Sequence, residues 1–253
     1  MALLSKLARE LSWQSKSLFS YSPSLPFKRG TRHLQKVTSQ YSEEVQYRYG
    51  QLQEKYQLGD WVKVCSPGEY IENLYILDIL DRYVPKPSAP GAGMDIGCRN
   101  FSHLPALSAF YPADWLGVEL DANARYLNGF TRRAYGEWMA KQRPGSRYVA
   151  GSLLEVQERA DLIVWVLPFV VRAPLQHWGL PDRYFQPRAL LQHATSLLQE
   201  NGNLLIVNQA QMEMEAQQAL LNEVGISAQA LGELDSVFSR FRQSRFGYLV
   251  SRR

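Results

Sequence analysis

The chain is poor in cysteine and has no long apolar run. It holds two cysteines in 253 residues, Cys65 and Cys98. Their separation matches no metal-binding spacing, so we expect neither a metal nor a disulfide framework, as is typical of a reducing compartment such as the cytoplasm. Because eighteen consecutive apolar residues never occur, we also expect no membrane-spanning segment. A length of 253 residues with 45% hydrophobic residues fits one α/β domain plus an extension.

Acidic residues are almost absent from the first forty positions, where Glu10 is the single acid among seven basic residues and many serines. Such a start is typical of an organelle transit peptide, of an arm that binds nucleic acid or an anionic surface, or of a mobile solvated leader. The sequence leaves all three open. We expect residues 1–30 to be a flexible leader with a short helix near Leu3–Leu18, and residues 31–90 to be a helical extension.

Periodicity predicts the elements that follow. An apolar stripe in steps of three and four predicts a helix over residues 33–57. The segment Ser66-Pro67-Gly68-Glu69 indicates a capping box that starts another helix. Strand-like segments alternate with helical ones from there on, at residues 93–97, 115–119, 147–151, 161–167, 203–208, 236–241 and 246–251. We therefore predict, over residues 91–253, a doubly wound, mostly parallel seven-stranded sheet whose terminal strand is antiparallel.

Glycine is scarce where the first strand of this domain ends. Met94-Asp95-Ile96-Gly97 is followed by Cys98-Arg99-Asn100-Phe101, so only one glycine of the pattern G-x-G-x-x-G is present. The next strand ends at Glu119, an acid placed to accept ribose hydroxyls. Bulky residues in the turn argue against the pyrophosphate of a nicotinamide cofactor. They argue less against an adenosine ligand that has no phosphate.

The chain resembles class I S-adenosylmethionine-dependent methyltransferases over residues 66–253. The resemblance is carried in order by four segments: residues 93–98, 117–121, 147–152 and 161–169. Two departures stand out, because Arg99 and Phe101 replace the later glycines of the first motif and Ser152 replaces the usual acid at the adenine loop. The resemblance implies S-adenosylmethionine (SAM) as cofactor and methyl transfer to an acceptor that the sequence does not identify. The alternative is a non-catalytic binding or scaffold protein with a degenerate methyltransferase fold.

The resemblance also implies a site at the carboxyl ends of the strands, where Glu119 binds the ribose and Asp95 orders the loop and binds the amino group. Asp121 is the substitute acid or a helix cap. The predicted cofactor-binding residues are Asp95, Gly97, Cys98, Glu119, Leu120, Ser152, Leu153 and Leu167. Packing is an equal or better interpretation for Cys98, and helix capping for Ser152. In the long segment 170–187, which we interpret as a lid, His177 is the single weak candidate for a catalytic base.

Overall fold

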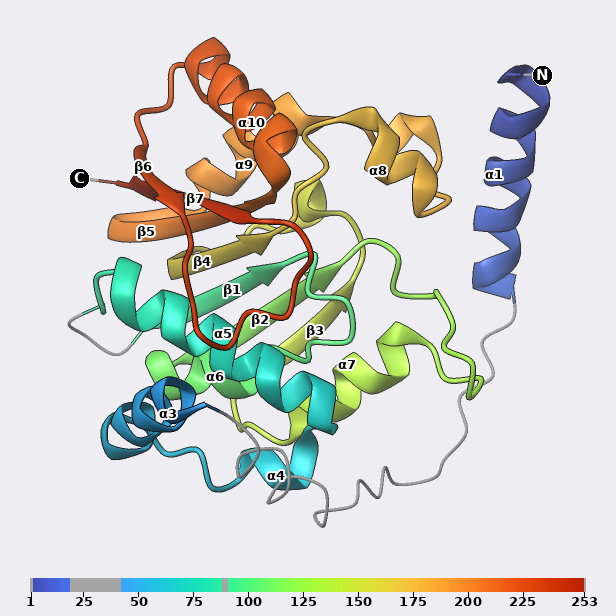
Figure 1. Cartoon of the computed structure of the whole chain (residues 1–253). Helices are drawn as coiled ribbons and strands as arrows, with labels where there is room; N and C mark the ends of the chain where they lie inside the picture. Colours follow the sequence, from blue (N-terminus) through green and yellow to red (C-terminus); the bar gives the residue numbers. More distant parts are fainter. Residues whose placement is uncertain (1, 19–41, 88–90, 253) are drawn as a thin grey trace.

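The computed structural model describes residues 2–18, 42–87 and 91–252, which form a seven-stranded sheet in the order β3-β2-β1-β4-β5-β7-β6 (Figure 1). Neighbouring strands among the first five pair in parallel, whereas β7 is antiparallel to both β5 and β6. The strands are β1 Ala92–Ile96, β2 Asp114–Glu119, β3 Arg147–Ala150, β4 Ala160–Val166, β5 Leu198–Gln209, β6 Gln229–Glu233 and β7 Arg245–Ser251. The predicted fold class is confirmed.

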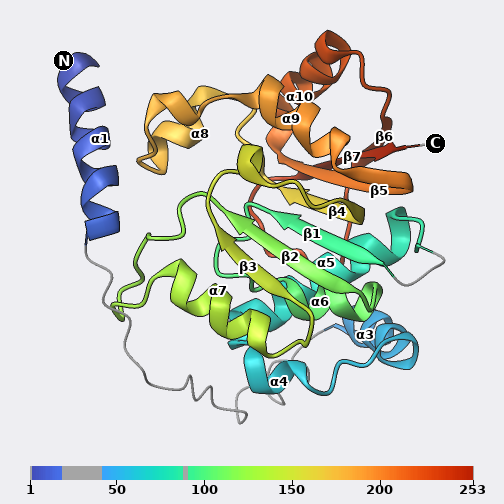
Figure 2. The same cartoon turned by 180° about the vertical axis from the view of Figure 1, so that it is seen from behind.

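Helices cover both faces of this sheet (Figures 1 and 2). The α-helices of the described residues are α1 Ala2–Leu18, α3 Glu43–Lys55, α4 Trp61–Val64, α5 Pro67–Tyr83, α6 Leu104–Phe110, α7 Arg132–Lys141, α8 Arg172–His177, α9 Pro187–Ser196 and α10 Ala210–Val224. The same residues form the short 3-10 helices η2 Leu153–Glu155 and η3 Asp182–Tyr184. Side chains of β4 alternate between the two layers: Leu162 and Val164 pack with α5 and α6, whereas Ile163 and Trp165 pack with α9 and α10. This double burial explains why β4 is apolar from Leu162 to Val166.

One predicted strand is wrong. Residues 236–241 belong to the connection between β6 and β7. The strand that precedes β7 in the chain and pairs with its outer edge is β6. The apolar residues that suggested a strand anchor this connection instead: Phe238 is buried, and its backbone N–H donates to Ser236 Oγ at 3.2 Å. The edge strand β6 is mostly exposed, so it lacks the alternation that predicts a strand.

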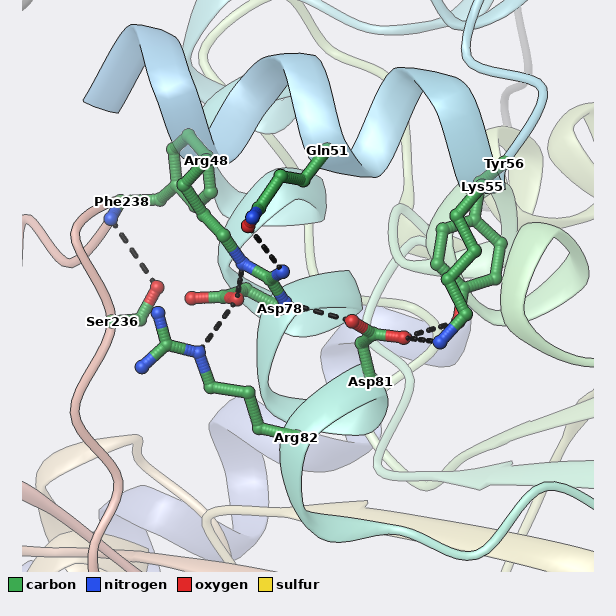
Figure 3. Close-up of polar contacts among 9 residues, drawn as sticks. All are labelled: Arg48, Gln51, Lys55, Tyr56, Asp78, Asp81, Arg82, Ser236 and Phe238. Atoms are coloured by element: carbon green, nitrogen blue, oxygen red, sulfur yellow. Dashed lines mark hydrogen bonds and ion pairs between the residues drawn. The ribbon is translucent and has the colours of Figure 1, made fainter. Parts of the chain in front are cut away.

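A polar cluster joins α3 to α5 within the helical extension (Figure 3). Asp78, which is fully buried, accepts from Arg48 Nε at 2.7 Å and from Arg82 Nε at 3.0 Å. Asp81, one turn further on, accepts from Arg48 Nη2 and from the Tyr56 hydroxyl. The predicted capping box at the start of α5 is confirmed. Of the predicted helix over residues 33–57, positions 33–41 lie outside the described residues.

Helix α1 contacts the opposite side of the molecule, beyond the carboxyl ends of the parallel strands (Figure 1). Lys16 Nζ lies 3.0 Å from Asp121 Oδ1, and Arg9 Nη2 lies 3.4 Å from Asp182 Oδ2. The Trp13 ring packs against Tyr184 at a centroid distance of 5.0 Å. The predicted short helix in the leader is confirmed, and residues 19–30 lie outside the described residues. The domain boundaries at residues 30 and 90 stay a prediction.

Within the described ranges, no helix combines the length and apolar character that a membrane span needs.

Candidate functional site

The loop after β1 has the left-handed backbone conformation that glycine favours, although two of the positions concerned hold Arg99 and Phe101. Gly97, Arg99 and Phe101 have φ angles of +69°, +53° and +57°, all in the left-handed region. Non-glycine residues rarely adopt this conformation, which is stored strain of about 1–3 kcal/mol each. A Cβ built on Gly97 meets no atom within 4 Å, so one face of the loop is open to a ligand.

Packing beneath the loop holds the two strained residues. Phe101 is fully buried, and a Cβ on Gly117 of β2 would lie 2.9 Å from its ring. The carbonyl oxygen of Arg99 accepts from the Tyr148 hydroxyl at 2.8 Å. These contacts explain how Arg99 and Phe101, which are not glycines, are held in the left-handed region at this turn.

Glu119 connects this loop to the end of β2. Its Oε2 accepts from the backbone N–H of Arg99, and its Oε1 accepts from that of Asp121, each at 2.7 Å. Arg132 Nη1 lies 3.4 Å from Glu119 Oε1 and 3.5 Å from Asp121 Oδ2. Burial raises the pKa of the Glu119 carboxyl despite the nearby Arg132 guanidinium. Each carboxylate oxygen has two lone pairs, so with these three donors bound the side chain can accept one more, on Oε2.

Asp95 presents the clearest unsatisfied group of the site. It is 1% exposed, and its Oδ2 atom is buried without a hydrogen-bond partner. Burial raises the pKa of this carboxyl to about 7. Nearby, His103 Nε2 lies 3.1 Å from Glu72 Oε1. Burial alone would raise the pKa of the Glu72 carboxyl. The hydrogen bond from His103 and the charges of His103 and Arg99 outweigh the effect of burial and lower this pKa to about 2. Buried polar atoms are normally paired, so Asp95 Oδ2 is a candidate ligand-binding atom.

The remaining predicted residues fall into three groups. Cys98 is buried and burial raises its thiol pKa well above the usual value, which fits packing rather than nucleophilic chemistry. Ser152 caps η2 by accepting from the Leu154 N–H at 3.2 Å, and Leu153 beside it is buried. Leu167 has a φ of +59° at the end of β4.

The structure brings Asp95, Gly97 and Glu119 together at the adjoining ends of β1 and β2, where they are joined by Leu120, the residue after β2. His177 differs from them, because it is the exposed last residue of α8, within the segment 170–187 that the sequence led us to interpret as a lid.

Sequence reasoning missed the cations that cover this edge. The Arg132 guanidinium stacks on the Trp178 ring of the lid at 5.0 Å while it contacts both acids after β2. Lys16 of α1 reaches Asp121 across 105 positions of the chain. In the sequence, residues 125–135 mix aromatic residues with arginines, a pattern that favours a helix with a core face and a solvated charged face over a nucleic-acid contact. One feature of the sequence could have predicted these cations. Glu119 and Asp121 are two acids close together after β2, and two carboxylates that are buried together need a cation beside them.

A pocket of about 520 Å³ lies between α1 and the lid. It is lined by Lys6, Leu7, Glu10, Arg172, Asp182 and Arg183. None of these residues belongs to the strand ends, so this pocket is separate from the edge that holds Asp95 and Glu119. Across residues 2–18, 42–87 and 91–252, no cluster of three or more histidine, cysteine or acidic side chains is arranged to hold a metal ion.

Comparison with known proteins identifies the fold. No family model and no curated protein matches the sequence. Among solved structures, a SAM-dependent methyltransferase from Aquifex aeolicus is 12% identical with a TM-score of 0.51, covering 78% of this chain and 99% of that one. A methyltransferase from Pyrococcus furiosus is 13% identical with a TM-score of 0.49, covering 72% and 82%. The chain has the class I methyltransferase fold, as the sequence resemblance implied.

Proposed function

We propose that this protein binds SAM at the ends of β1 and β2 and transfers its methyl group to an acceptor. The observation that supports this most strongly is the pairing of a buried, unpartnered carboxylate oxygen on Asp95 with the open face of Gly97. A cofactor with an ammonium group and no phosphate suits this combination, because the carboxylate takes the cation and the loop leaves space for it. The shared fold supports the same conclusion.

Each residue has a distinct part in the proposed site. Asp95 binds the cofactor's ammonium group, and the remaining lone pair of Glu119 Oε2 accepts a ribose hydroxyl. Residues Leu120, Ser152 and Leu153 line the adenine, while Cys98 packs beneath the loop and Leu167 forms the rim on the acceptor side.

When bound, SAM supplies a methyl group on a sulfonium that a nucleophilic acceptor can attack. The protein's own contribution is then alignment and exclusion of water, to which Trp178 stacked on Arg132 contributes from the lid. His177 stays a weak candidate base.

Native mass spectrometry of the full chain tests this proposal. After addition of SAM, we expect the mass to rise by one cofactor per chain. Subsequent incubation with methyl-labelled SAM and pooled small-molecule, RNA and protein fractions should label one class of acceptor. Binding without any transfer would favour the non-catalytic alternative, and the lack of an adduct would contradict the proposal.

Cofactor affinity is expected to fall at acidic pH. The Asp95 carboxyl has a pKa of about 7 and must be ionised to bind an ammonium group, so affinity should drop up to about tenfold per pH unit below 7. The charged groups that influence Asp95 most are His103, Glu119, Arg99 and Glu72. The free energy of unfolding changes in the opposite direction. Because the Asp95 carboxyl has a higher pKa in the folded chain than in the unfolded chain, its contribution to stability is greatest below the unfolded pKa and is lost as the pH rises through 7.

Calorimetric titrations between pH 5.5 and 8.5 check this expectation. Asp95→Asn should flatten the profile while His103 is still present. If the affinity of Asp95→Asn still falls with pH, the pH dependence belongs to His103 and the role of Asp95 is contradicted. Burial lowers the pKa of His103, but Glu72 outweighs this effect and raises it.

Deletion of residues 1–30 is expected to lower the melting temperature by less than about 5 °C. Helix α1 is held by ion pairs of Lys6 and Arg9 with Asp182 and of Lys16 with the buried Asp121. Solvent-exposed pairs contribute about 0–1 kcal/mol each, and Arg132 still pairs with Asp121 when Lys16 is removed. If the leader also binds a polyanion, the deletion should flatten the salt dependence of RNA binding measured by fluorescence anisotropy. A fall above about 10 °C would show that α1 is a structural part of the domain.

A further inference from the structure

Arg245 is placed at the same edge of the sheet as the proposed cofactor site. It is the first residue of β7 and pairs in register with Gln209, the last residue of β5. Because β7 runs antiparallel to β5, its first residue lies where the parallel strands end. On this edge β5 alone separates β7 from β4, the strand that leads to Leu167 on the acceptor side of the site proposed above.

Arg245 is buried, and among the described residues its Nη1 atom has no hydrogen-bond partner. The residue is 8% exposed. The two nearest acids are engaged elsewhere, since Glu72 pairs with His103 and Glu213 Oε2 accepts from the Gln209 N–H at 2.9 Å. Burial lowers the pKa of Arg245 despite these acids. A buried guanidinium without an ion pair is costly, which indicates that its partner is a ligand.

A second buried donor lies beside it. Tyr75 of α5 is 2% exposed, and its hydroxyl is buried without a partner. One aromatic ring covers both groups: Phe241 lies 4.2 Å from the Arg245 guanidinium carbon and meets the Tyr75 ring edge-on at 5.0 Å. A guanidinium and a phenol that face the same ring can bind the same anion when that ring moves away.

The covering ring belongs to an exposed part of the chain. Residues 239–244, in the connection between β6 and β7, are all exposed, and Phe241 itself is 37% exposed. In Figure 1 this connection crosses in front of α5. It therefore has few buried contacts to hold it closed, and displacement of Phe241 would require little disruption of the core.

We propose that Arg245 and Tyr75 form a subsite for the carboxylate of a small organic methyl acceptor, with Phe241 as its cover when no acceptor is bound. The inference rests on the proposed function and adds a substrate class to it. The planar guanidinium binds a carboxylate through two parallel hydrogen bonds. The subsite itself holds one buried cation, which suits a single carboxylate, whereas Arg240 and Arg242 in the same connection are exposed.

Benzoate and its neutral analogue benzamide probe this subsite directly. Saturation-transfer NMR and titration with the full chain should show binding of benzoate at least tenfold tighter than that of benzamide. Arg245→Met should abolish the preference for benzoate, and Phe241→Ala should bind benzoate at least as tightly as the wild type. The matched control is Arg188→Met, which removes an exposed arginine paired to Glu223 on another face and should change nothing.

Stability separates a ligand-binding role from a structural one. Because Arg245 has no ion pair, Arg245→Met should melt no more than a few degrees below the wild type. If that variant does not fold, Arg245→Lys retains the charge without the planar fork and should bind benzoate several-fold more weakly.

Equal binding of benzoate and benzamide, lack of benzoate binding, or wild-type affinity in Arg245→Met would each overturn the subsite. The titrations are run with and without S-adenosylhomocysteine. Loss of cofactor binding with intact benzoate binding would then refute the proposed function and leave the subsite standing.

Discussion

Gly97→Val is expected to weaken the binding of S-adenosylhomocysteine by at least about 100-fold, which corresponds to about 2.7 kcal/mol. Gly97 has a φ of +69°, where a β-branched residue is strongly disfavoured, so the loop must shift or bear the strain. The valine methyl groups would also project over the loop face that meets no other atom within 4 Å. Isothermal titration calorimetry measures the loss, and a thermal melt establishes that the variant remains folded.

Gly225→Val separates strain from ligand contact. Gly225 ends α10 with a φ of +70°, and a Cβ there also meets no atom within 4 Å. Its substitution should therefore lower stability by a similar amount and leave cofactor affinity unchanged. If Gly97→Val binds like the wild type, or if both variants lose affinity equally, the loop does not approach the cofactor as proposed.

Glu119→Ala is expected to reduce cofactor affinity by about 10- to 150-fold for each charged hydrogen bond lost, because such bonds contribute about 1.5–3 kcal/mol. The substitution removes the proposed ribose acceptor and also the group that holds the Arg99 N–H at 2.7 Å. Since two buried N–H groups lose their acceptor, we expect some loss of stability as well.

Asp121→Asn is the matched control for Glu119→Ala. Asp121 is also buried beside Arg132, but its side chain accepts no loop amide. We expect its cofactor affinity to stay within about threefold of the wild type, which is less than 1 kcal/mol. A larger loss in Asp121→Asn than in Glu119→Ala would move the ribose contact to Asp121.

The parallel sheet was predictable from the sequence because its strands carry strong local signals. From Leu162 to the end of β4 the strand is continuously apolar, because Leu162 and Ile163 are buried on opposite faces. The start of α5 was predictable because the capping box requires a specific residue at each end of a four-residue window. Edge strand β6 lacked any such signal, because four of its five residues are exposed and only backbone pairing with β7 defines it.

The site was predictable in position and only partly in geometry. Strand ends placed Asp95 and Glu119 together, as parallel topology requires. The left-handed conformations of Arg99 and Phe101 were not predictable, because local propensity opposes them and packing against Gly117 and Tyr148 imposes them. The contact between Lys16 and Asp121 joins positions 105 apart, for which one sequence carries no signal.

Calorimetric titration of the wild-type full chain with S-adenosylhomocysteine at pH 8 tests the central claim most directly. At this pH most of the Asp95 carboxyl is ionised, since its pKa is about 7. The account predicts saturable binding of one cofactor molecule per chain, with a dissociation constant well below about 1 mM, or more than about 4 kcal/mol of binding free energy. Absence of saturable binding up to that concentration would contradict it.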